Sequence, residues 1–349
     1  MAILGNGKIK VLIVDDSTSM RLLVRSVLSA DPSIEIAGMA ADGVEAVEKA
    51  LALKPDVITM DVEMPRMDGI TAMRQIMAKL PGTRVLMLSS VTQEGAKTTF
   101  EALEAGAFDY IPKNTNSGFE AEIVAKVKES VRSRFGRATA QPQIRTVVPS
   151  ATAALSKGKK INFVGIGAST GGPVALQEVL TKIPAGFPYG IFIAIHMPKA
   201  FTGTYAERIN NKCAINVREA VDGEFLKPGT ALIAPGGMHA TLVRQGGNLA
   251  VKIHQAAEFP QHVFVPSVDI MMSSMAEASG GGMLGVILTG MGSDGFKGMQ
   301  LLKQKGGTTI VQDEATSVIY GMPKACVDGH VADFVLPIGQ IGVEISKFG

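Results

Sequence analysis

Short apolar runs alternate with amphipathic stretches through the first part of the chain. Between Lys10 and about Arg132 the apolar runs are VLIV, IEIAGMA, VITM, RVLML and FDYI, and a stretch with helical spacing of apolar residues follows each of them. Strands that alternate with helices in this way form parallel sheets covered by helices on both faces. The pattern therefore predicts five βα units around a five-stranded parallel sheet.

The same alternation resumes at Ile161. The runs INFVGIGA, GIFIAIHM, INVREA, TALIAPGG, LGVILTGMG, TTIVQD and VADFVLP are typical of strands. The segment HATLVRQGGNLAVKIH has two apolar arms around Gly246 and Gly247, which predicts a β-hairpin. We predict the α/β class with two doubly wound domains, a five-stranded parallel one in residues 1–131 and a larger, mostly parallel one with an antiparallel hairpin in residues 161–349.

Residues 132–160 have a different composition from the segments on either side. They contain seven Arg or Lys residues and no acidic residue, and Pro142 and Pro149 interrupt them. This composition is typical of a solvated basic linker between domains. A tether that touches an acidic partner is the alternative.

Composition narrows the class of protein. The 349 residues are 46% apolar and 19% charged, with 39 Gly and no Trp, as in globular α/β proteins. No run of 18 apolar residues and no signal-peptide pattern is found, so we expect a cytoplasmic protein without direct membrane insertion. A net charge of +2 argues against nucleic acid as the main partner. Two distant cysteines, Cys213 and Cys326, argue against disulfides and thiolate metal sites.

Polar residues follow the strands of the first half at the points where ligands collect in parallel sheets. They are Asp15, Asp16, Asp61, Ser89 and Lys113. Three carboxylates at one edge repel one another unless a cation is bound, and Mg²⁺ prefers oxygen ligands. With the metal and an ammonium balancing the charge, one carboxylate can accept a phosphoryl group. The alternative is that these acids are helix N-caps, as we expect for Asp42 and Asp68.

At these positions the first half resembles a response-regulator receiver domain over essentially its whole length. The resemblance lies in VDDS, MDVEMPRMDG, the LSS of the fourth strand and the segment from Tyr110 to Lys113. One departure is Asn114, where the family usually has proline. The resemblance implies a phosphoacceptor, a Mg²⁺ site and two residues that support the phosphoryl group. The implied phosphoacceptor is Asp61, the metal contacts are Asp16, Asp61, Asp15 through water and the Glu63 carbonyl, and the supporting residues are Ser89 and Lys113.

The segment GIGASTGG, residues 165–172, lies between a predicted strand and a predicted helix, and three interpretations compete for it. A dinucleotide fingerprint needs glycine at position 170, where the chain has Thr170, and no acidic residue closes the next strand. The same letters from Gly167 to Gly171 fit G-x-S-x-G, a turn that exposes the hydroxyl of Ser169 as a nucleophile. A plain glycine-rich turn stays open.

A serine nucleophile needs a base and an acid that orients the base. His196 and Asp294 both follow predicted strands, at the edge where they could meet Ser169. The alternatives are a structural histidine and an N-cap for a helix beginning near Phe296. A second triad with His330 as base has the chain order of α/β-hydrolases, but His330 precedes a strand and so lies at the opposite edge.

The second half resembles the catalytic domain of chemotaxis-specific protein-glutamate methylesterases of the CheB type. The resemblance lies in GASTGGP, HMPKAFT, APGGMH, PSVDIMMSSMA, LTGMGSDG and IVQDEATSVIYGMPKA. Ile195 stands where glutamine often precedes the histidine, and Ser293 fills a variable position. The family implies Ser169 as nucleophile, His196 as base and Asp294 as its orienting acid, with Thr170 supporting the site and the Met291 amide as oxyanion donor.

The resemblance also implies a function for the whole chain. It implies phosphorylation-activated hydrolysis of glutamyl methyl esters on methyl-accepting chemotaxis receptors, with deamidation of receptor glutamines as a second activity and no cofactor in the esterase site. A sensor histidine kinase would be the phosphodonor, and we expect a monomer. Two alternatives stay open, a catalytically silent binding module gated by phosphorylation and a DNA-binding response regulator, although no basic recognition helix is evident.

Overall fold

The computed structural model describes residues 7–113, 118–139 and 161–348. The chain divides into two compact units, Met1–Gln141 and Pro142–Gly349. Among the described residues, no helix has both the length and the apolar character that a membrane span requires. Most of the expected linker, residues 140–160, and Asn114 lie outside the described residues, so the expected domain boundaries stay a prediction.

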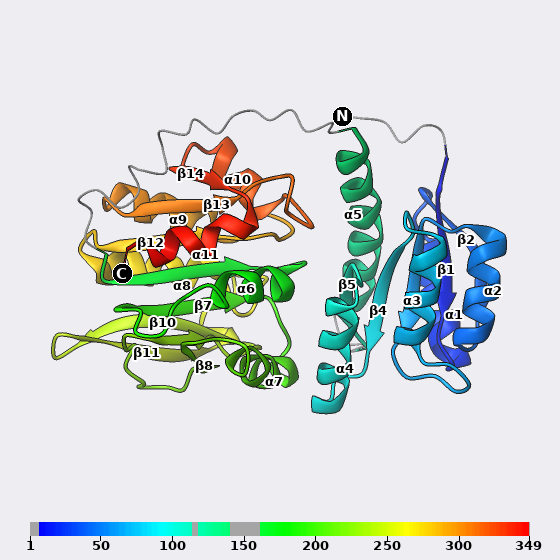
Figure 1. Ribbon diagram of the computed structural model, residues 1–349, viewed down its shortest axis with the longest axis horizontal. Helices are drawn as coiled ribbons and strands as arrows, with labels where there is room; N and C mark the ends of the chain where they lie inside the picture. The colour runs from blue at the N-terminus through cyan, green and yellow to red at the C-terminus, as the bar shows by residue number, and fades with distance from the viewer. Residues whose placement is uncertain (1–6, 114–117, 140–160, 349) are drawn as a thin grey trace. The chain divides into compact units, whose positions relative to one another are not determined.

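The first unit has a five-stranded sheet in the order β2-β1-β3-β4-β5, and the neighbouring strands are parallel (Figure 1). The predicted doubly wound architecture is therefore confirmed. The strands are β1 (Ile9–Val14), β2 (Ile34–Ala40), β3 (Val57–Asp61), β4 (Arg84–Ser89) and β5 (Asp109–Pro112). The helices are α1 (Thr18–Ser29), α2 (Gly43–Leu53), α3 (Gly69–Lys79), α4 (Gln93–Glu104) and α5 (Phe119–Thr139).

Side-chain caps begin helices α2 and α3 of the first unit, where the sequence predicts them. Asp42 accepts hydrogen bonds from the amides of Val44 and Glu45 at the start of α2, and Asp68 accepts one from Thr71 at the start of α3. Each satisfies backbone donors that have no partner within the helix. Both acids are N-caps, as expected.

The second unit has a seven-stranded parallel sheet in the order β14-β13-β12-β6-β7-β9-β8. Its strands are β6 (Phe163–Ala168), β7 (Gly190–Ile195), β8 (Asn216–Glu219), β9 (Thr230–Ile233), β12 (Met283–Ile287), β13 (Thr308–Gln312) and β14 (Phe334–Leu336). Its helices are α6 (Gly172–Leu180), α7 (Lys199–Asn210), the 3₁₀ helix η2 (Ala256–Glu258), α8 (Val268–Ser279), α9 (Phe296–Gln304), α10 (Met322–Asp328) and α11 (Ile338–Ser346).

The predicted hairpin is present. Strands β10 (Met238–Gln245) and β11 (Asn248–Gln255) pair antiparallel, with Gln245 opposite Asn248. Gly246 and Gly247 between them have φ values of 54° and 88°, which suit the two-residue turns of hairpins and which other residues rarely adopt. The hairpin forms a sheet of its own beside the parallel sheet, which confirms the mostly parallel architecture with an antiparallel insertion.

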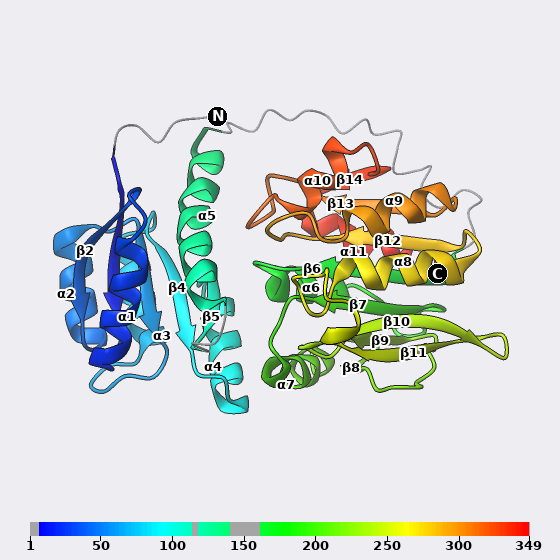
Figure 2. The same ribbon diagram turned by 180° about the vertical axis from the view of Figure 1, so that it is seen from behind.

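Helices cover both faces of the large sheet. Helices α6, α7 and α11 lie on one face, and α8, α9 and the β10–β11 hairpin lie on the other, which Figure 2 shows from behind. The layer between α8, α9 and the sheet is rich in methionine, including the buried residues Met272, Met275 and Met299. These long, flexible side chains fill the space left by glycines in the strands. At Gly165 of β6, for example, an added Cβ atom would lie 2.9 Å from the sulfur of Met272.

Two helical glycines differ in the space around them, and we expect alanine substitutions at the two positions to have different effects on the stability of the second unit. A Cβ atom at Gly298 of α9 would lie 2.4 Å from the Cβ atom of Met272 in α8, whereas one at Gly203 of α7 would meet only the Glu219 carboxylate, at 3.9 Å. Gly298→Ala should destabilise the second unit by about 1–3 kcal/mol through overpacking. Gly203→Ala should leave it unchanged or stabilise it by up to about 1 kcal/mol. Urea unfolding followed by circular dichroism measures both, and equal effects would contradict the packing described.

Candidate active site

Three adjacent strands of the large sheet end at the candidate site. Strand β6 lies between β12 and β7, so the loops that follow these strands lie side by side at the carboxyl edge. Ser169 follows β6 directly, His196 follows β7, and Asp294 lies in the loop after β12. The chain leaves β6 toward β7 and later returns to β12 on the other side of β6. This is a topological switch point, where α/β sheets bind ligands.

Ser169 occupies a strand-to-helix turn. Its amide donates to the carbonyl of Thr289 at 3.0 Å, and its carbonyl accepts from the amide of Gly172, the first residue of α6, at 2.6 Å. Gly171 between them has a φ of 73°. The turn is the structural context that G-x-S-x-G requires.

The loop after β12 packs directly against this turn. A Cβ atom at Gly290 would lie 2.8 Å from the Cβ atom of Ser169, so only glycine permits the approach. Met291 is the next residue along this loop. Thr170 is buried, and its carbonyl accepts a hydrogen bond from Thr289 Oγ1 at 3.0 Å, which ties the turn to the same loop.

The three side chains form one hydrogen-bonded row. His196 Nδ1 lies 3.0 Å from Ser169 Oγ, and His196 Nε2 lies 2.8 Å from Asp294 Oδ2. An ionised carboxylate only accepts hydrogen bonds, so Nε2 carries the proton, and Nδ1 presents its lone pair to the serine hydroxyl. This tautomer suits an imidazole that removes the hydroxyl proton.

Asp294 also accepts hydrogen bonds from the beginning of α8. The Ser267 hydroxyl and the Asp269 amide donate to Oδ1 at 2.9 Å each, and the Val268 amide donates to Oδ2 at 2.7 Å. Burial acts to raise the pKa of Asp294, but the hydrogen bond and charge of His196 and these amides outweigh it, and the pKa falls below its ordinary value. Asp294 therefore stays ionised as the imidazole changes its charge.

The alternative that Asp294 is the N-cap of α9 is wrong. Helix α9 begins at Phe296 after Gly295, whereas the amides that the Asp294 carboxylate accepts belong to α8, more than twenty residues earlier in the chain. The rival base, His330, lies between α10 and β14, at the entrance of that strand. His196 is the histidine that reaches Ser169.

Two contacts of the row were not predicted from the sequence. Ser267 donates to Asp294, and the ring of Phe264 stacks on the imidazole of His196 with ring centroids 4.3 Å apart and 7° between the planes. Ser267 could have been found, because a serine directly before a helical run with Asp269 in its first turn is an N-cap pattern. Phe264 carries no comparable signal. Ile195, the departure beside the histidine, is buried.

The first unit brings together the acidic residues predicted at its sheet edge. Oxygen atoms of Asp15, Asp16 and Asp61 lie within 4.8 Å of one another, and Asp15 and Asp61 are buried. Lys113 Nζ lies 2.8 Å from Asp15 Oδ2 and 2.7 Å from Asp61 Oδ2. The ammonium of Lys113 thus pairs with two of the three carboxylates.

This imbalance of charge fits a divalent cation. Burial raises the pKa of Asp61 to about 6, with a contribution from the charge of Asp15, although Lys113 and the Glu63 amide act to lower it. Ionised Asp61 therefore lowers the stability of the folded unit. Carboxylate oxygens are the ligands that Mg²⁺ prefers, and a bound Mg²⁺ ion would supply the missing positive charge.

Ser89 and Glu63 lie at this edge but make other contacts. The hydroxyl of Ser89 donates to the carbonyl of Gly95 at 3.1 Å and accepts from Thr99 in α4, so it faces α4 in place of Asp61. The contact of Glu63 with Asp61 is made by its amide. The roles expected for Ser89 and for the Glu63 carbonyl stay predictions.

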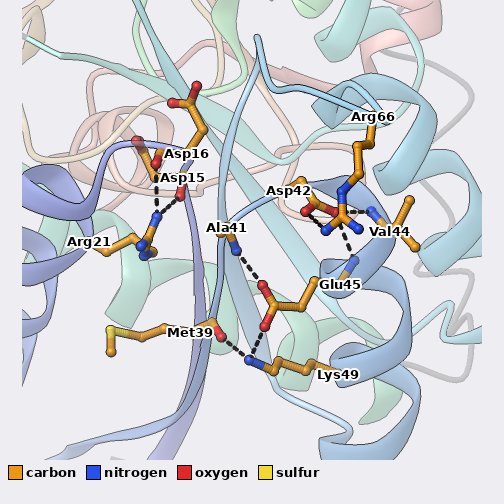
Figure 3. A network of polar contacts seen from close by, with 10 residues as sticks. All are labelled: Asp15, Asp16, Arg21, Met39, Ala41, Asp42, Val44, Glu45, Lys49 and Arg66. Atoms are coloured by element: carbon orange, nitrogen blue, oxygen red, sulfur yellow. Dashed lines mark hydrogen bonds and ion pairs between the residues drawn. The ribbon is translucent and has the colours of Figure 1, made fainter.

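An arginine that the sequence did not single out holds the acidic loop. Arg21 Nη1 donates to the backbone carbonyls of Asp15 and Asp16 at 2.6 and 3.0 Å and not to their carboxylates, as Figure 3 shows. In the same view Arg66 pairs with the Asp42 carboxylate and so links the loops after β2 and β3. Arg21 lies six residues after Asp15 and five after Asp16, in the first turn of α1, and no sequence pattern distinguishes this position.

Comparisons with known proteins agree on both units. A family model described as CheB methylesterase matches residues 164–345, and one described as response regulator receiver domain matches residues 11–128. The chain is 58% identical to a Geobacter sulfurreducens protein named protein-glutamate methylesterase/protein-glutamine glutaminase 1, over 98% of each chain. It is 59% identical to protein-glutamate methylesterase/protein-glutamine glutaminase 5 of Geobacter metallireducens, over 97% of each.

A solved structure resembles the second unit. In the crystal structure of the Thermotoga maritima CheB methylesterase catalytic domain, the sequence is 37% identical to this chain and the fold matches with a TM-score of 0.52. The match covers 54% of this chain and all of that one.

The raised pKa of Asp61 predicts how the stability of the receiver unit depends on pH. The folded pKa of about 6 lies above the ordinary value of 3.8, so the folded state binds more protons and the free energy of unfolding falls as pH rises from about 4 to about 6. In EDTA, Asp61→Asn should therefore stabilise the unit at pH 7 by on the order of 2 kcal/mol and have little effect at pH 4.

Urea unfolding of both proteins at the two pH values measures this difference. Saturating Mg²⁺ at pH 7 should raise the stability of the wild type more than that of Asp61→Asn, because the variant has lost a carboxylate ligand. The same pH dependence in both proteins would contradict the buried anionic site.

Proposed function

Since this chain belongs to the CheB methylesterase family and carries an N-terminal response regulator receiver domain, we propose that Ser169, His196 and Asp294 hydrolyse glutamyl methyl esters of chemotaxis receptors. The chain is a hydrolase of this family. The observation that carries the assignment of residues is the hydrogen-bonded row from Ser169 through His196 to Asp294. The proposal is that this row is the catalytic triad.

The proposed reaction has two steps. In the first, Ser169 Oγ attacks the γ-carbonyl carbon of the glutamyl ester while His196 Nδ1 accepts the hydroxyl proton. The tetrahedral intermediate collapses, the bond to the methoxy group breaks, and the imidazolium returns its proton to the leaving oxygen as methanol. In the second step His196 removes a proton from water, which attacks the acyl-serine, and the glutamate side chain leaves with Ser169 restored.

Each step builds negative charge on the carbonyl oxygen. We assign the Met291 amide as a donor to that oxygen, because Gly290 lets the loop after β12 lie against Ser169. One such donor contributes about 3–4 kcal/mol to the transition state. Thr170 supports this arrangement through its hydrogen bond with Thr289.

Deamidation of receptor glutamines uses the same groups. An amide carbonyl passes through the same tetrahedral intermediate, and the imidazolium donates its proton to nitrogen in place of oxygen, so that ammonia leaves. The names of the relatives at 58% and 59% identity include both activities. We propose both for this chain, with no cofactor in the esterase site.

The receiver unit points to control by phosphorylation. We assign Asp61 as the phosphoacceptor, with Asp15, Asp16 and the Glu63 carbonyl as contacts of Mg²⁺ and a sensor histidine kinase as the phosphodonor. Mg²⁺ would neutralise charge on the phosphoryl oxygens. Lys113, which now bridges Asp15 and Asp61, would pair with the phosphoryl group, and Ser89 would reach it by turning away from Gly95.

Triad variants test the chemistry. With a methylated receptor fragment, Ser169→Ala and His196→Ala should lower the rate of methanol release to near the background, and Asp294→Asn should lower kcat by about 10³–10⁴-fold, because the imidazole loses the acceptor that sets its tautomer. Gly203→Ala is a control that leaves the site intact. Methanol release by Ser169→Ala at the wild-type rate would rule out the nucleophile.

A phosphodonor tests the control. Acetyl phosphate with Mg²⁺ should raise methanol release by the full chain, and Asp61→Ala should show the basal rate with or without it. The physical requirement is that phosphorylation favours the active arrangement over the inactive one, since equal stabilisation of both changes nothing. Equal rates of the wild type with and without the donor, with Asp61 phosphorylation verified by mass spectrometry, would remove the gating proposal and leave the esterase assignment intact.

A further inference from the structure

An aromatic residue from a separate loop lies on the imidazole of the row. Phe264 belongs to the segment between η2 and α8, and its ring is nearly parallel to that of His196, with the centroids 4.3 Å apart. The contact lies on the face of the imidazole, whereas the bonds to Ser169 and Asp294 lie at its ring nitrogens. The imidazole ring of His196 is thus contacted at its nitrogens by Ser169 and Asp294 and on its face by Phe264.

The loop that carries Phe264 is tied down on both sides of it. The carbonyl of Val265 accepts a hydrogen bond from the Gly237 amide at 3.2 Å, and His262 Nδ1 lies 3.2 Å from the hydroxyl of Ser267, the residue that donates to Asp294. Val263 is 89% exposed, whereas Phe264 is 36% exposed. The loop therefore exposes one apolar side chain and places the next on the imidazole.

We propose that Phe264 is a positioning residue that keeps the imidazole of His196 in the orientation needed for hydrolysis of the acyl-serine. This inference rests on the function proposed above. Before acylation two hydrogen bonds fix the ring, but once the oxygen of Ser169 is esterified it has no proton to share with Nδ1, and the bond to Asp294 is the remaining one of the two. A ring held by one hydrogen bond can swing about that bond. The stacked phenyl ring opposes this motion while His196 takes a proton from water.

The phenyl face also favours the charged form of the base. In both steps the imidazole becomes positive, and the negative face of an aromatic ring attracts a cation at this separation. A leucine at position 264 would fill similar space but would supply neither a flat surface nor this charge distribution. A tyrosine would supply both.

Steady-state kinetics of methanol release test the positioning role of Phe264. Phe264→Leu should lower kcat by about threefold to tenfold, a loss typical of one aromatic contact, and KM should fall with it, because slower hydrolysis of the acyl-serine lowers both constants and leaves kcat/KM nearly unchanged. Phe264→Tyr should restore kcat. Val263→Ala, at the exposed neighbouring position, is the matched control and should keep wild-type kcat. An unchanged kcat in Phe264→Leu, a change confined to KM, or an equal loss in Phe264→Tyr would each overturn the proposal.

Nuclear magnetic resonance of the full chain tests the stack without any substrate. The ring current of Phe264 should shift the imidazole C–H resonances of His196 upfield; the chain has five histidines, and His196→Ala identifies the signal. Phe264→Leu and a second variant, Phe264→Ala, should move the resonances downfield, and Phe264→Tyr should not. Unshifted resonances in the wild type would overturn the proposal. Activity that survives in Ser169→Ala would instead remove the proposed function, so the two failures are distinguishable.

Discussion

The carboxylate of Asp294 joins the fold of the second unit to its chemistry. Its two oxygens accept four hydrogen bonds, three from the beginning of α8 and one from His196. The exposed amides and positive end of a helix stabilise an anion, and the pKa of Asp294 lies below its ordinary value despite burial. The same atoms that satisfy the first turn of α8 therefore fix the tautomer of the imidazole, and the imidazole presents a lone pair to Ser169.

The order of the strands makes this contact possible. Ser169, His196 and Asp294 are far apart along the chain but follow three adjacent parallel strands, β6, β7 and β12, which end at one edge. The receiver unit uses the same principle for a different purpose. There the strand ends collect carboxylates around Lys113, with more negative than positive charge, which fits a bound cation and a phosphoryl group.

Much of this arrangement could be predicted from the sequence, because it follows from the spacing of apolar residues and from the position of polar residues at the ends of strands. Alternating apolar runs predicted both parallel sheets, and two adjacent glycines predicted the hairpin between β10 and β11. The rule that parallel strands end at one edge was enough to bring Ser169, His196 and Asp294 together as candidates. The same rule separated His196 from His330, because His196 follows a strand and His330 precedes one.

Contacts made across the fold could not be predicted in this way. The alternative for Asp294 was an N-cap of the helix that follows it in sequence. The helix that donates to its carboxylate is α8, because the packing of α8 against α9 brings that helix end to the loop after β12. The stack of Phe264 on His196 depends on the path of a loop, and no local pattern encodes that path. The hydroxyl of Ser89 faces Gly95, a choice of rotamer that periodicity does not fix.

The central claim is that the serine, the imidazole and the carboxylate act as one catalytic unit. A double-mutant cycle tests it most directly, with kcat for methanol release measured in His196→Ala, Asp294→Ala and the double variant. Because Asp294 acts on the reaction through His196, the account predicts that the double variant is no slower than His196→Ala alone. Losses that multiply, as for two independent groups, would contradict it.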